Sequence, residues 1–446
     1  MIAFVKRNIL PFSVFITGAC VLIIEIVAVR VLSPHYGNTI FTVSSVISVI
    51  LAALSVGYWV GGKFADRHPS IKLFWGIVMI SGLLVIAFHF IGTVILPTLS
   101  VQFSIVTGPI ISSILLFLLP ALLLGTLSPY AIKLQSLIVT DQGIGSISGK
   151  IFFWSTFGSI SGSLLAGFVL IPRFGIDNIF IYTGIVLFIL GLIPLLISGY
   201  SKKMLSVAAL GIVLLTAITS VSAKQTNDAV IYNKDGVYEK ITILDGTLGG
   251  RPTRFFQQDK SRSGAMFLDS NDPTDLVYGY TKYYSIYKLF KPEIENALVI
   301  GGGAYSIPKA LLYENPDSII DVVEIEPSLF ELSKEYFDVK ESPNLNNYTE
   351  DGRRFLRDSE KEYDLIFSDV YYSLFSIPSH FTTKEFFEIA KEKLSEEGIF
   401  VANLIGNLSR QEPSFIFTEI KTFKSVFPNS YFFAVESPGQ TNSQGL

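Results

Sequence analysis

The sequence predicts an α-helical membrane domain, then a small β subdomain, and then an α/β domain with a parallel sheet. Residues 1–223 consist largely of apolar runs long enough to cross a bilayer, whereas residues 224–446 have the mixed composition of a soluble protein. Charge is divided in the same way: the first part holds 11 Lys and Arg against 4 Asp and Glu, and the second holds 23 against 34. Strand-like and helix-like segments alternate from residue 297 onward, which is typical of a parallel sheet.

Windows of about twenty residues give seven candidate spans in residues 1–223. The first is too long for a cleaved signal peptide. Nine Lys and Arg fall on one side of this arrangement, and only Arg30 and Arg173 fall on the other. We therefore expect a multi-pass protein of the plasma membrane with its N-terminus in the cytoplasm. The spans lie near 9–32, 39–62, 72–97, 105–127, 151–171, 177–198 and 204–222.

The side of the membrane that holds the soluble part stays open. Seven spans would place it outside the cell, whereas a cofactor made in the cytosol favours the inside. Residues 204–222 are only weakly hydrophobic and carry Ser and Thr near their end. They could lie along the membrane interface and leave the soluble part in the cytoplasm.

Some features of the membrane half are candidates for function. Glu25 and Arg30 stand in an otherwise apolar span, and an ionisable group at membrane depth is a functional candidate by default. Glu25 is therefore a candidate substrate contact, although the two side chains could simply pair, or Arg30 could reach the interface. Gly61–Arg67 resembles the loop motif of major facilitator transporters. Such a transporter has twelve spans, so at most half of one is present. Small residues at 155–167 predict close helix packing.

Cysteine chemistry is not expected. Cys20 is the single cysteine and lies in an apolar run, so neither a disulfide framework nor a Cys-ligated metal site is available. We expect no metal site.

The β subdomain is expected at residues 224–292. Residues 230–243 form two alternating runs about an Asn-Lys-Asp-Gly turn, which predicts a hairpin, and residues 253–259 predict a third strand. Residues 275–287 are rich in tyrosine and predict a helix leading into the next domain. Most of these rings are expected to pack in the interior, but Tyr280 or Tyr284 could face a substrate.

The α/β domain is expected at residues 293–446, as a Rossmann-like fold of the methyltransferase type. A site is expected at the carboxyl ends of its strands. Because a seventh, antiparallel strand would normally follow the sixth, the domain is expected to be truncated at its C-terminus. The predicted strands lie near 297–300, 320–325, 346–349, 364–368, 398–404 and 430–435.

A glycine-rich turn follows the first of these strands. Gly301, Gly302 and Gly303 would let a ligand approach the backbone, and the helix start that follows offers free N–H groups. The third glycine of a dinucleotide fingerprint would fall at Ser306, so the match is incomplete. We therefore expect a nucleoside without a pyrophosphate, as in an S-adenosylmethionine-type cofactor, rather than NAD. A tight turn with no ligand is the alternative.

Acids follow the next three strands. Glu324 and Glu326 share one face of the second strand, and an acid there is placed to accept both ribose hydroxyls. Asp351 follows the third strand, where it could accept from an adenine amino group or cap the next helix. Asp369 follows the fourth strand and is succeeded by two tyrosines, beside the expected cofactor sulfur.

These residues resemble the spermidine synthase (aminopropyltransferase) family over about residues 229–435. The similarity is carried by the β subdomain and by the motifs Val299–Gly303, Val323–Glu326, Glu350–Gly352 and Tyr363–Asp369. Together with the helical half, the chain is similar to membrane-fused spermidine-synthase-like proteins of bacteria and archaea.

The resemblance implies decarboxylated S-adenosylmethionine or S-adenosylmethionine as the cofactor. It implies that Glu324 holds the ribose, that Asp351 holds the adenine, and that Asp369 engages the amine acceptor. The implied cofactor residues are Gly301, Gly302, Gly303, Glu324, Asp351 and Gly352, and the implied catalytic residues are Asp369, Tyr371 and Tyr372.

The chemistry of such a transfer depends on a proton. A protonated amine, with a pKa near that of Lys at roughly 10, is not a nucleophile until it loses that proton. A carboxylate beside the electrophilic carbon can take the proton or orient it for loss to water. The sulfonium leaving group drives the reaction, and the protein supplies alignment. An acidic domain with tyrosine faces suits a cationic acceptor.

Two positions depart from the family pattern. The family has an Asp directly after its glycines, which grips the terminal amine of the donor, and Ala304 stands there in this chain. The family also has a second Asp three residues after the catalytic one, where Tyr372 stands. The cofactor fold is therefore better supported than polyamine specificity. A different donor or acceptor, such as a lipid amine or a hydrophobic amine from the bilayer, fits these departures.

The first functional hypothesis is a membrane-bound aminopropyltransferase that uses decarboxylated S-adenosylmethionine and an amine acceptor. The alternatives are an S-adenosylmethionine-dependent methyltransferase acting on an amine or lipid-borne acceptor, and a non-catalytic sensor or transporter of polyamines or nucleosides. Glu25, the transporter-like loop and the missing acids motivate the last of these. We expect a small amine and the lipid bilayer as partners and no nucleic acid, with a homodimer left open.

Overall fold

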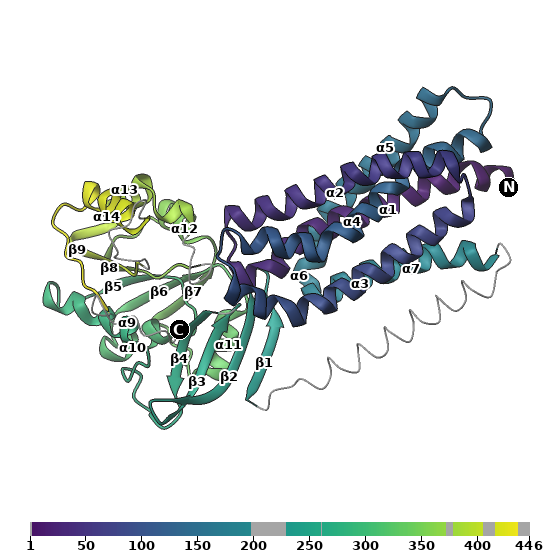
Figure 1. Ribbon diagram of the computed structural model, residues 1–446. Helices are drawn as coiled ribbons and strands as arrows, with labels where there is room; N and C mark the ends of the chain where they lie inside the picture. Colours follow the sequence, from purple (N-terminus) through teal and green to yellow (C-terminus); the bar gives the residue numbers. More distant parts are fainter. Residues whose placement is uncertain (1, 198–228, 260, 372–377, 405–414, 436–446) are drawn as a thin grey trace. The chain divides into compact units, whose positions relative to one another are not determined.

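The computed structural model describes residues 2–197, 229–259, 261–371, 378–404 and 415–435 (Figure 1). The chain divides into two compact units, Met1–Thr226 and Asn227–Leu446, and each is described by itself.

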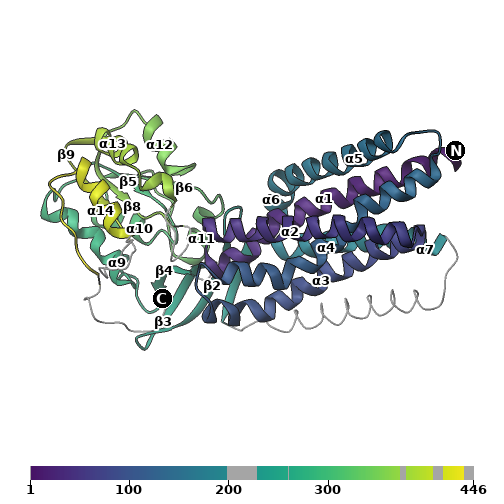
Figure 2. The ribbon, with the colours of Figure 1, turned by 45° about the horizontal axis from the view of Figure 1, so that its top comes forward.

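The first unit is a bundle of long helices lying side by side (Figure 2). By length and apolar composition, six stretches of the described residues suffice to cross a bilayer, and they cover the first six predicted spans. Residues 204–222, the seventh, lie outside the described part of the chain. The helices are α1 (Ile2–Tyr36), α2 (Ile40–Arg67), α3 (Ile71–Gln102), α4 (Gly108–Ile138), α5 (Ile144–Leu165) continued by η1 (Ala166–Leu170) and α6 (Ile171–Arg173), and α7 (Ile176–Ile197).

Glycines bring the helices of this bundle together in pairs. A Cβ added at Gly57 of α2 would lie 2.3 Å from the carbonyl oxygen of Leu122 in α4. A Cβ at Gly158 of α5 would lie 2.0 Å from the carbonyl oxygen of Phe15 in α1. Such distances leave room only for hydrogen, so the backbones touch. The small residues at 155–167 therefore serve packing, as predicted. Glu25 is half-buried on α1, and its contact with a substrate stays a prediction.

The second unit begins with an antiparallel sheet in the order β1-β2-β3-β4. Its strands are β1 (Val230–Asp235), β2 (Lys240–Leu248), β3 (Arg251–Gln258) and β4 (Ser261–Phe267). The predicted hairpin and third strand are confirmed, but β4 was not predicted. Its sequence, Ser-Arg-Ser-Gly-Ala-Met-Phe, lacks alternation of apolar and polar residues, and it is held in the sheet by its pairing with β3 across a bulge.

The tyrosine-rich segment differs from its prediction. A helix was expected at 275–287, but helical structure is confined to α9 (Gly279–Lys282) and a 3₁₀ helix, η2 (Tyr283–Leu289). The preceding residues are extended because Leu276 bridges to Met266 of β4, and because Asp275 accepts a hydrogen bond of 2.8 Å from Arg251. These tertiary contacts override the helical pattern.

The parallel sheet confirms the Rossmann-like prediction. Its order is β7-β6-β5-β8-β9, so the chain runs outward from β5 to β7 and then crosses to the other side. The topological switch therefore lies between β5 and β8, where such sheets bind ligands. The strands are β5 (Asn296–Ile300), β6 (Ile319–Glu324), β7 (Leu345–Thr349), β8 (Tyr363–Ser368) and β9 (Leu394–Ala402).

Helices cover both faces of this sheet. One face packs on α10 (Ser306–Glu314) and α11 (Leu329–Tyr336) through a core that also takes in β2 and β3. The other face packs on α12 (Gly352–Asp358), α13 (Lys384–Glu392) and α14 (Phe415–Val426), and a short 3₁₀ turn, η3 (Ser379–Phe381), lies beside them. The sheet is thus buried on both sides, and its polar groups gather where the strands end.

The sixth predicted strand is wrong. Residues 430–435 form no strand, and their aromatic side chains pack on other rings instead. The pairs are Tyr431 on Phe290, Phe432 on Phe423, and Phe433 on Tyr283, with ring centroids 5.6, 5.8 and 6.2 Å apart. The apolar pattern of this segment comes from that packing and not from a sheet. A further strand beyond it would fall outside the described residues.

We expect Gly57→Ala to destabilise the first unit by about 1–3 kcal/mol, because the new methyl group would force the backbones of α2 and α4 apart. The measurement is thermal unfolding of the detergent-solubilised protein followed by tryptophan fluorescence. This signal reports the first unit alone, since all three tryptophans lie there: Trp59, Trp75 and Trp154.

Gly62→Ala is the matched control. It makes the same exchange in the same helix, but the nearest atom to the added methyl group is Cβ of Pro129 at 3.9 Å. Its stability is expected to stay within about 1 kcal/mol of the wild type. Equal losses in both variants would contradict the packing account.

Candidate functional site

Backbone hydrogen bonds continue the sheet one residue past the ends of its central strands. The N–H of Gly301 donates to the carbonyl of Val323 at 2.9 Å, and the N–H of Asp369 donates to the carbonyl of Ile300 at 2.9 Å. The N–H of Asn403 donates to the carbonyl of Ser368 at 3.0 Å. The residues that follow β5, β8 and β9 are thereby fixed side by side, and their side chains meet at one edge of the sheet.

The glycine turn requires glycine for a backbone reason. Gly301 has φ +93°, and a Cβ there would lie 2.2 Å from the carbonyl oxygen of Asp369. Gly303 also has a positive φ, +52°. Tyr305, at φ +57°, ends the turn before α10 and is fully buried, with its hydroxyl donating to Asn347. The turn is therefore shaped by close approach of backbone to backbone.

Glu324 holds this turn from the end of β6. One carboxylate oxygen, Oε2, accepts hydrogen bonds from the N–H groups of Gly302 at 2.8 Å and Gly303 at 3.2 Å. The other, Oε1, accepts from the N–H of Glu326 at 2.9 Å. Glu324 is 7% exposed, and burial raises its pKa, although these N–H donors oppose that shift. A carboxylate has about four acceptor positions, so Glu324 can still accept from a ligand.

Glu326 lies on the same face, as predicted, but contacts the first sheet. Its Oε2 accepts from the N–H of Tyr238 at 3.0 Å, in the turn of the β1–β2 hairpin, and its Oε1 accepts from the hydroxyl of Ser328 at 3.0 Å. This acid therefore joins the hairpin to the end of β6.

Asp351 has two partners. Its Oδ1 accepts from the N–H of Arg354 at 2.9 Å and caps α12, so the capping alternative is confirmed. Its Oδ2 lies 3.0 Å from Nε2 of His380, a residue of η3. The next residue, Gly352, has no room for a side chain, because a Cβ there would lie 2.3 Å from the side chain of Ile300. Glycine thus lets α12 start directly against β5.

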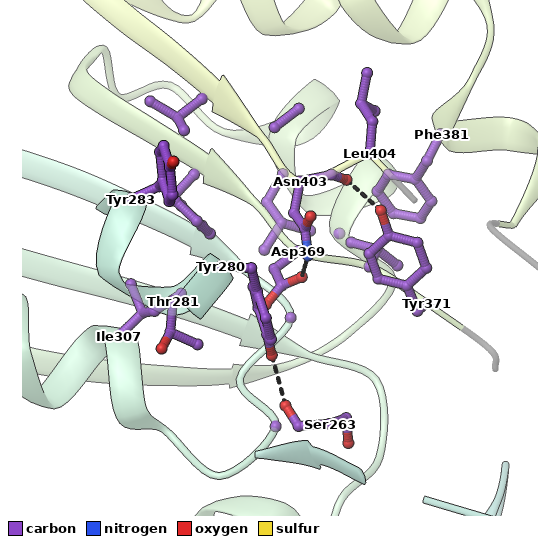
Figure 3. A pocket seen from close by; sticks show the side chains of 18 of the residues that line it. Ser263, Tyr280, Thr281, Tyr283, Ile307, Asp369, Tyr371, Phe381, Asn403 and Leu404 are labelled. Carbon is purple, nitrogen blue, oxygen red and sulfur yellow. Dashed lines mark hydrogen bonds between the residues drawn. The ribbon is translucent and has the colours of Figure 1, made fainter. Parts of the chain in front are cut away.

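Asp369 is the acid at the switch point (Figure 3). Its Oδ1 accepts a hydrogen bond of 2.9 Å from the amide of Asn403. Burial raises its pKa to about 6, and the Asn403 amide opposes that rise. Tyr280 stands beside it and donates to the carbonyl of Ser263 at 2.7 Å. Burial, and to a smaller degree the charge of Asp369, raise the pKa of Tyr280 well above its ordinary value.

One large cavity brings most of the predicted residues together. It has a volume of about 1340 Å³ and reaches from the glycine turn past Asp369 to β9 and α14. Of the predicted site residues, it is lined by Gly301, Gly302, Gly303, Glu324, Asp351, Gly352, Asp369, Tyr371 and Tyr280.

Three predicted residues are not among those that line this cavity. Tyr284 is 3% exposed and packs in the core of the second unit, so the structure does not place it at a substrate. Glu25 belongs to the first unit. Tyr372 lies outside the described residues, and its role stays a prediction.

Sequence reasoning missed Asn403 and His380. Asn403 donates to Asp369 and accepts a hydrogen bond from the hydroxyl of Tyr371 on its backbone carbonyl. It follows β9, so the rule of strand ends could have found it. His380 follows no strand, and nothing in its local sequence indicates that it contacts Asp351. The hydrogen bond from Tyr280 to the backbone carbonyl of Ser263 could not be predicted, because any residue at position 263 offers that carbonyl.

Comparison with known proteins agrees with this geometry. Residues 284–443 match the spermine/spermidine synthase domain. This similarity covers the parallel sheet and its helices, here called the synthase domain. The polyamine aminopropyltransferase of Vibrio vulnificus is 28% identical over 211 residues, which are 46% of this chain and 68% of that protein. The polyamine aminopropyltransferase of Clostridium beijerinckii is 30% identical over 175 residues, which are 38% of this chain and 58% of that protein.

A solved structure is also similar to the synthase domain. It is a probable spermidine synthase from Corynebacterium glutamicum, 24% identical, with a TM-score of 0.35. The match covers 40% of this chain and 64% of that one. The relatives with curated names are transferases, and the helical first unit lies outside the matched domain.

We expect Asp369→Asn to stabilise the second unit at pH 8, by an amount on the order of 2 kcal/mol. The folded protein holds the proton of Asp369 up to pH about 6, whereas the ordinary value is 3.8. Stability is therefore lost as pH rises between these values, and the asparagine variant escapes that loss. The gain should shrink as pH falls toward 4.

The measurement is the free energy of opening for the amides of β5 and β8, from hydrogen exchange at several pH values. Asp317→Asn, the same exchange in the exposed turn before β6, is the control and should change little. A gain from Asp369→Asn that does not vary with pH would contradict the burial account.

Proposed function

We propose that this chain is a membrane-bound aminopropyltransferase that moves the aminopropyl group of decarboxylated S-adenosylmethionine to an amine acceptor. The observation that supports this most is the convergence of the glycine turn, Glu324, Asp351 and Asp369 on one cavity. The spermine/spermidine synthase domain and the polyamine aminopropyltransferases among its relatives support the same class of reaction.

The nucleoside of the donor would lie along the ends of β5, β6 and β7. Glu324 would accept from the ribose hydroxyls with the acceptor positions that the turn leaves open. Asp351 would accept from the adenine amino group with Oδ2, the oxygen that faces His380. Because both carboxylates are already held by backbone N–H groups, little side-chain entropy would be lost when the nucleoside binds.

The transfer itself needs alignment and a proton acceptor. The amine nitrogen would attack the methylene carbon next to the sulfonium, and a C–N bond would form as the C–S bond breaks. The electron pair of that bond goes to sulfur and leaves methylthioadenosine. Asp369, with a pKa of about 6, is ionised at neutral pH and is a stronger base than an ordinary aspartate. Asn403 fixes the orientation of its carboxylate.

A second candidate is methyl transfer from S-adenosylmethionine itself to an amine or lipid-borne acceptor. Ala304 stands where the related family has an acid for the donor amine, and it packs against Gly264 of β4, whose added Cβ would lie 2.6 Å from the alanine methyl group. Arg262 of β4 lines the same cavity, with its guanidinium 4.4 Å from the ring of Phe255. A donor that retains its carboxylate would meet a cation there.

We expect the detergent-solubilised protein to bind methylthioadenosine in calorimetric titration and to release it from decarboxylated S-adenosylmethionine when an amine is present. Asp369→Asn should lower turnover by roughly 10²–10⁴-fold with little change in methylthioadenosine affinity, because it removes the proton acceptor and leaves the nucleoside site intact. Glu324→Gln should lower the affinity itself. No binding of either donor or of methylthioadenosine would exclude the proposal.

The two donors are separated by the same titrations. An aminopropyltransferase binds the decarboxylated donor more tightly, whereas a methyltransferase binds S-adenosylmethionine more tightly and loses that preference in Arg262→Ala. Binding without any turnover, and with no effect of Asp369→Asn, would favour a sensor or transporter.

We further propose that the protein spans the membrane with residues 227–446 in the cytoplasm. Within the described residues, six helices suited to crossing a bilayer return the chain to the side of its N-terminus by Ile197, and the loop charges favour a cytoplasmic N-terminus. Residues 204–222 would then lie along the membrane interface. Protease added to sealed inverted vesicles should then degrade residues 227–446, whereas protease added to right-side-out vesicles should not. The reverse pattern would place this unit outside.

A further inference from the structure

The cavity of the synthase domain is divided by charge. Among the described residues, six acids and Arg262 line it, and all of them lie between residues 239 and 369. The described lining residues in 394–404 and 415–435 include no charged side chain. They come from β9, from α14 and from the segment 429–435, and they include Val401, Ile420, Phe427 and Phe433. One end of the cavity therefore suits a cation, and the other suits an apolar group.

The apolar end of the cavity is formed by side chains that specific packing contacts hold in place. The segment 429–435 is held over it by the three ring pairs that replace the predicted sixth strand. Gly279 lets this segment approach α9, since an added Cβ would lie 3.3 Å from Val435. The apolar end also begins at the reacting carboxylate, because Asn403 at the end of β9 donates to Asp369. Whatever amine reaches Asp369 therefore has this apolar wall beside it.

The cavity has room for more than a donor. Its volume of about 1340 Å³ exceeds the roughly 300–1,000 Å³ typical of a pocket for one small ligand. The nucleoside accounts for the acid-lined end at Glu324 and Asp351. The acceptor must therefore carry its reactive nitrogen to Asp369 and extend the rest of its length along β9.

We propose that the acceptor is a monoamine with an apolar arm, and that this arm lies between β9, α14 and the segment 429–435. The inference rests on the proposed transfer to an amine and names its acceptor class. A diamine or polyamine would bring a second ammonium group to the apolar end, where no described lining residue offers a carboxylate. Burying that charge unpaired is costly, whereas each methylene buried there raises affinity about fourfold.

The test measures affinities of matched amines for the full, detergent-solubilised protein with methylthioadenosine bound. Butylamine is compared with 1,4-diaminobutane, hexylamine with 1,6-diaminohexane, and octylamine extends the monoamine series. We expect affinity to rise about fourfold for each added methylene among the monoamines, and each monoamine to bind at least tenfold more tightly than the diamine of equal length. Diamines that bind as tightly or more tightly would overturn the inference.

Phe433→Glu provides a second arm, because it places a carboxylate in the apolar wall at a side chain that is 52% exposed. We expect it to weaken octylamine binding at least tenfold and to reduce or reverse the preference over diamines. Phe417→Glu is the matched control, since Phe417 is 43% exposed on α14 and does not line the cavity. Unchanged methylthioadenosine affinity in both variants shows that the site remains folded. Equal amine affinities in the two variants would overturn the inference.

The same assays separate this inference from the proposed function. Release of methylthioadenosine with diamines alone would leave aminopropyl transfer standing and overturn the apolar acceptor. Absence of methylthioadenosine release from decarboxylated S-adenosylmethionine with every amine would overturn the proposed aminopropyl transfer, while the binding series would still test the acceptor site. Octylamine in solution, compared with octadecylamine supplied in lipid nanodiscs, distinguishes a soluble acceptor from one taken out of a bilayer.

Discussion

The site depends on hydrogen bonds between one buried carboxylate, Glu324, and the glycine turn after β5. Glu324 accepts from the N–H groups of Gly302 and Gly303, and this holds the turn open toward the ends of β6 and β8. Without that anion, the N–H donors of these two half-buried glycines would lose their partner. The positions of Asp369 and Asn403 follow, because the backbone of each is bonded to the neighbouring strand end.

The arrangement trades stability for chemistry. Buried acids are unfavourable in their charged form, and the raised pKa of Asp369 expresses that penalty. The domain tolerates it because the acids stand at strand ends, where backbone N–H groups and the Asn403 amide supply partners. Burial of Asp369 carries this cost for the fold. It also makes the carboxylate a better base, so the same burial that weakens the fold favours proton transfer.

Much of this site could be predicted because it follows from local pattern and one topological rule. Glycines after β5 and acids after β6, β7 and β8 converge wherever parallel strands end together. Other features depend on contacts that no local pattern reports. Tyr280 and Tyr284 lie in the same tyrosine-rich segment, yet only Tyr280 reaches the cavity, because the turn from α9 into η2 sets their directions. The segment 430–435 has the composition of a strand, but distant rings decide its position.

Because of the close approach at Gly301, the presence of the glycine motif in another sequence does not by itself indicate that a ligand binds there. Position 301 is closed to any side chain by the carbonyl oxygen of Asp369, whether or not a ligand is ever bound. Glu324 likewise has a structural role without a ligand, because it accepts a hydrogen bond from the N–H of Gly302 in the turn. A descendant that had lost its reaction would still need glycine at position 301, and its turn would still be more stable with an acceptor at position 324. Inactive paralogues are therefore better recognised by changes at the Asp369 and Asn403 side chains, which the backbone does not require.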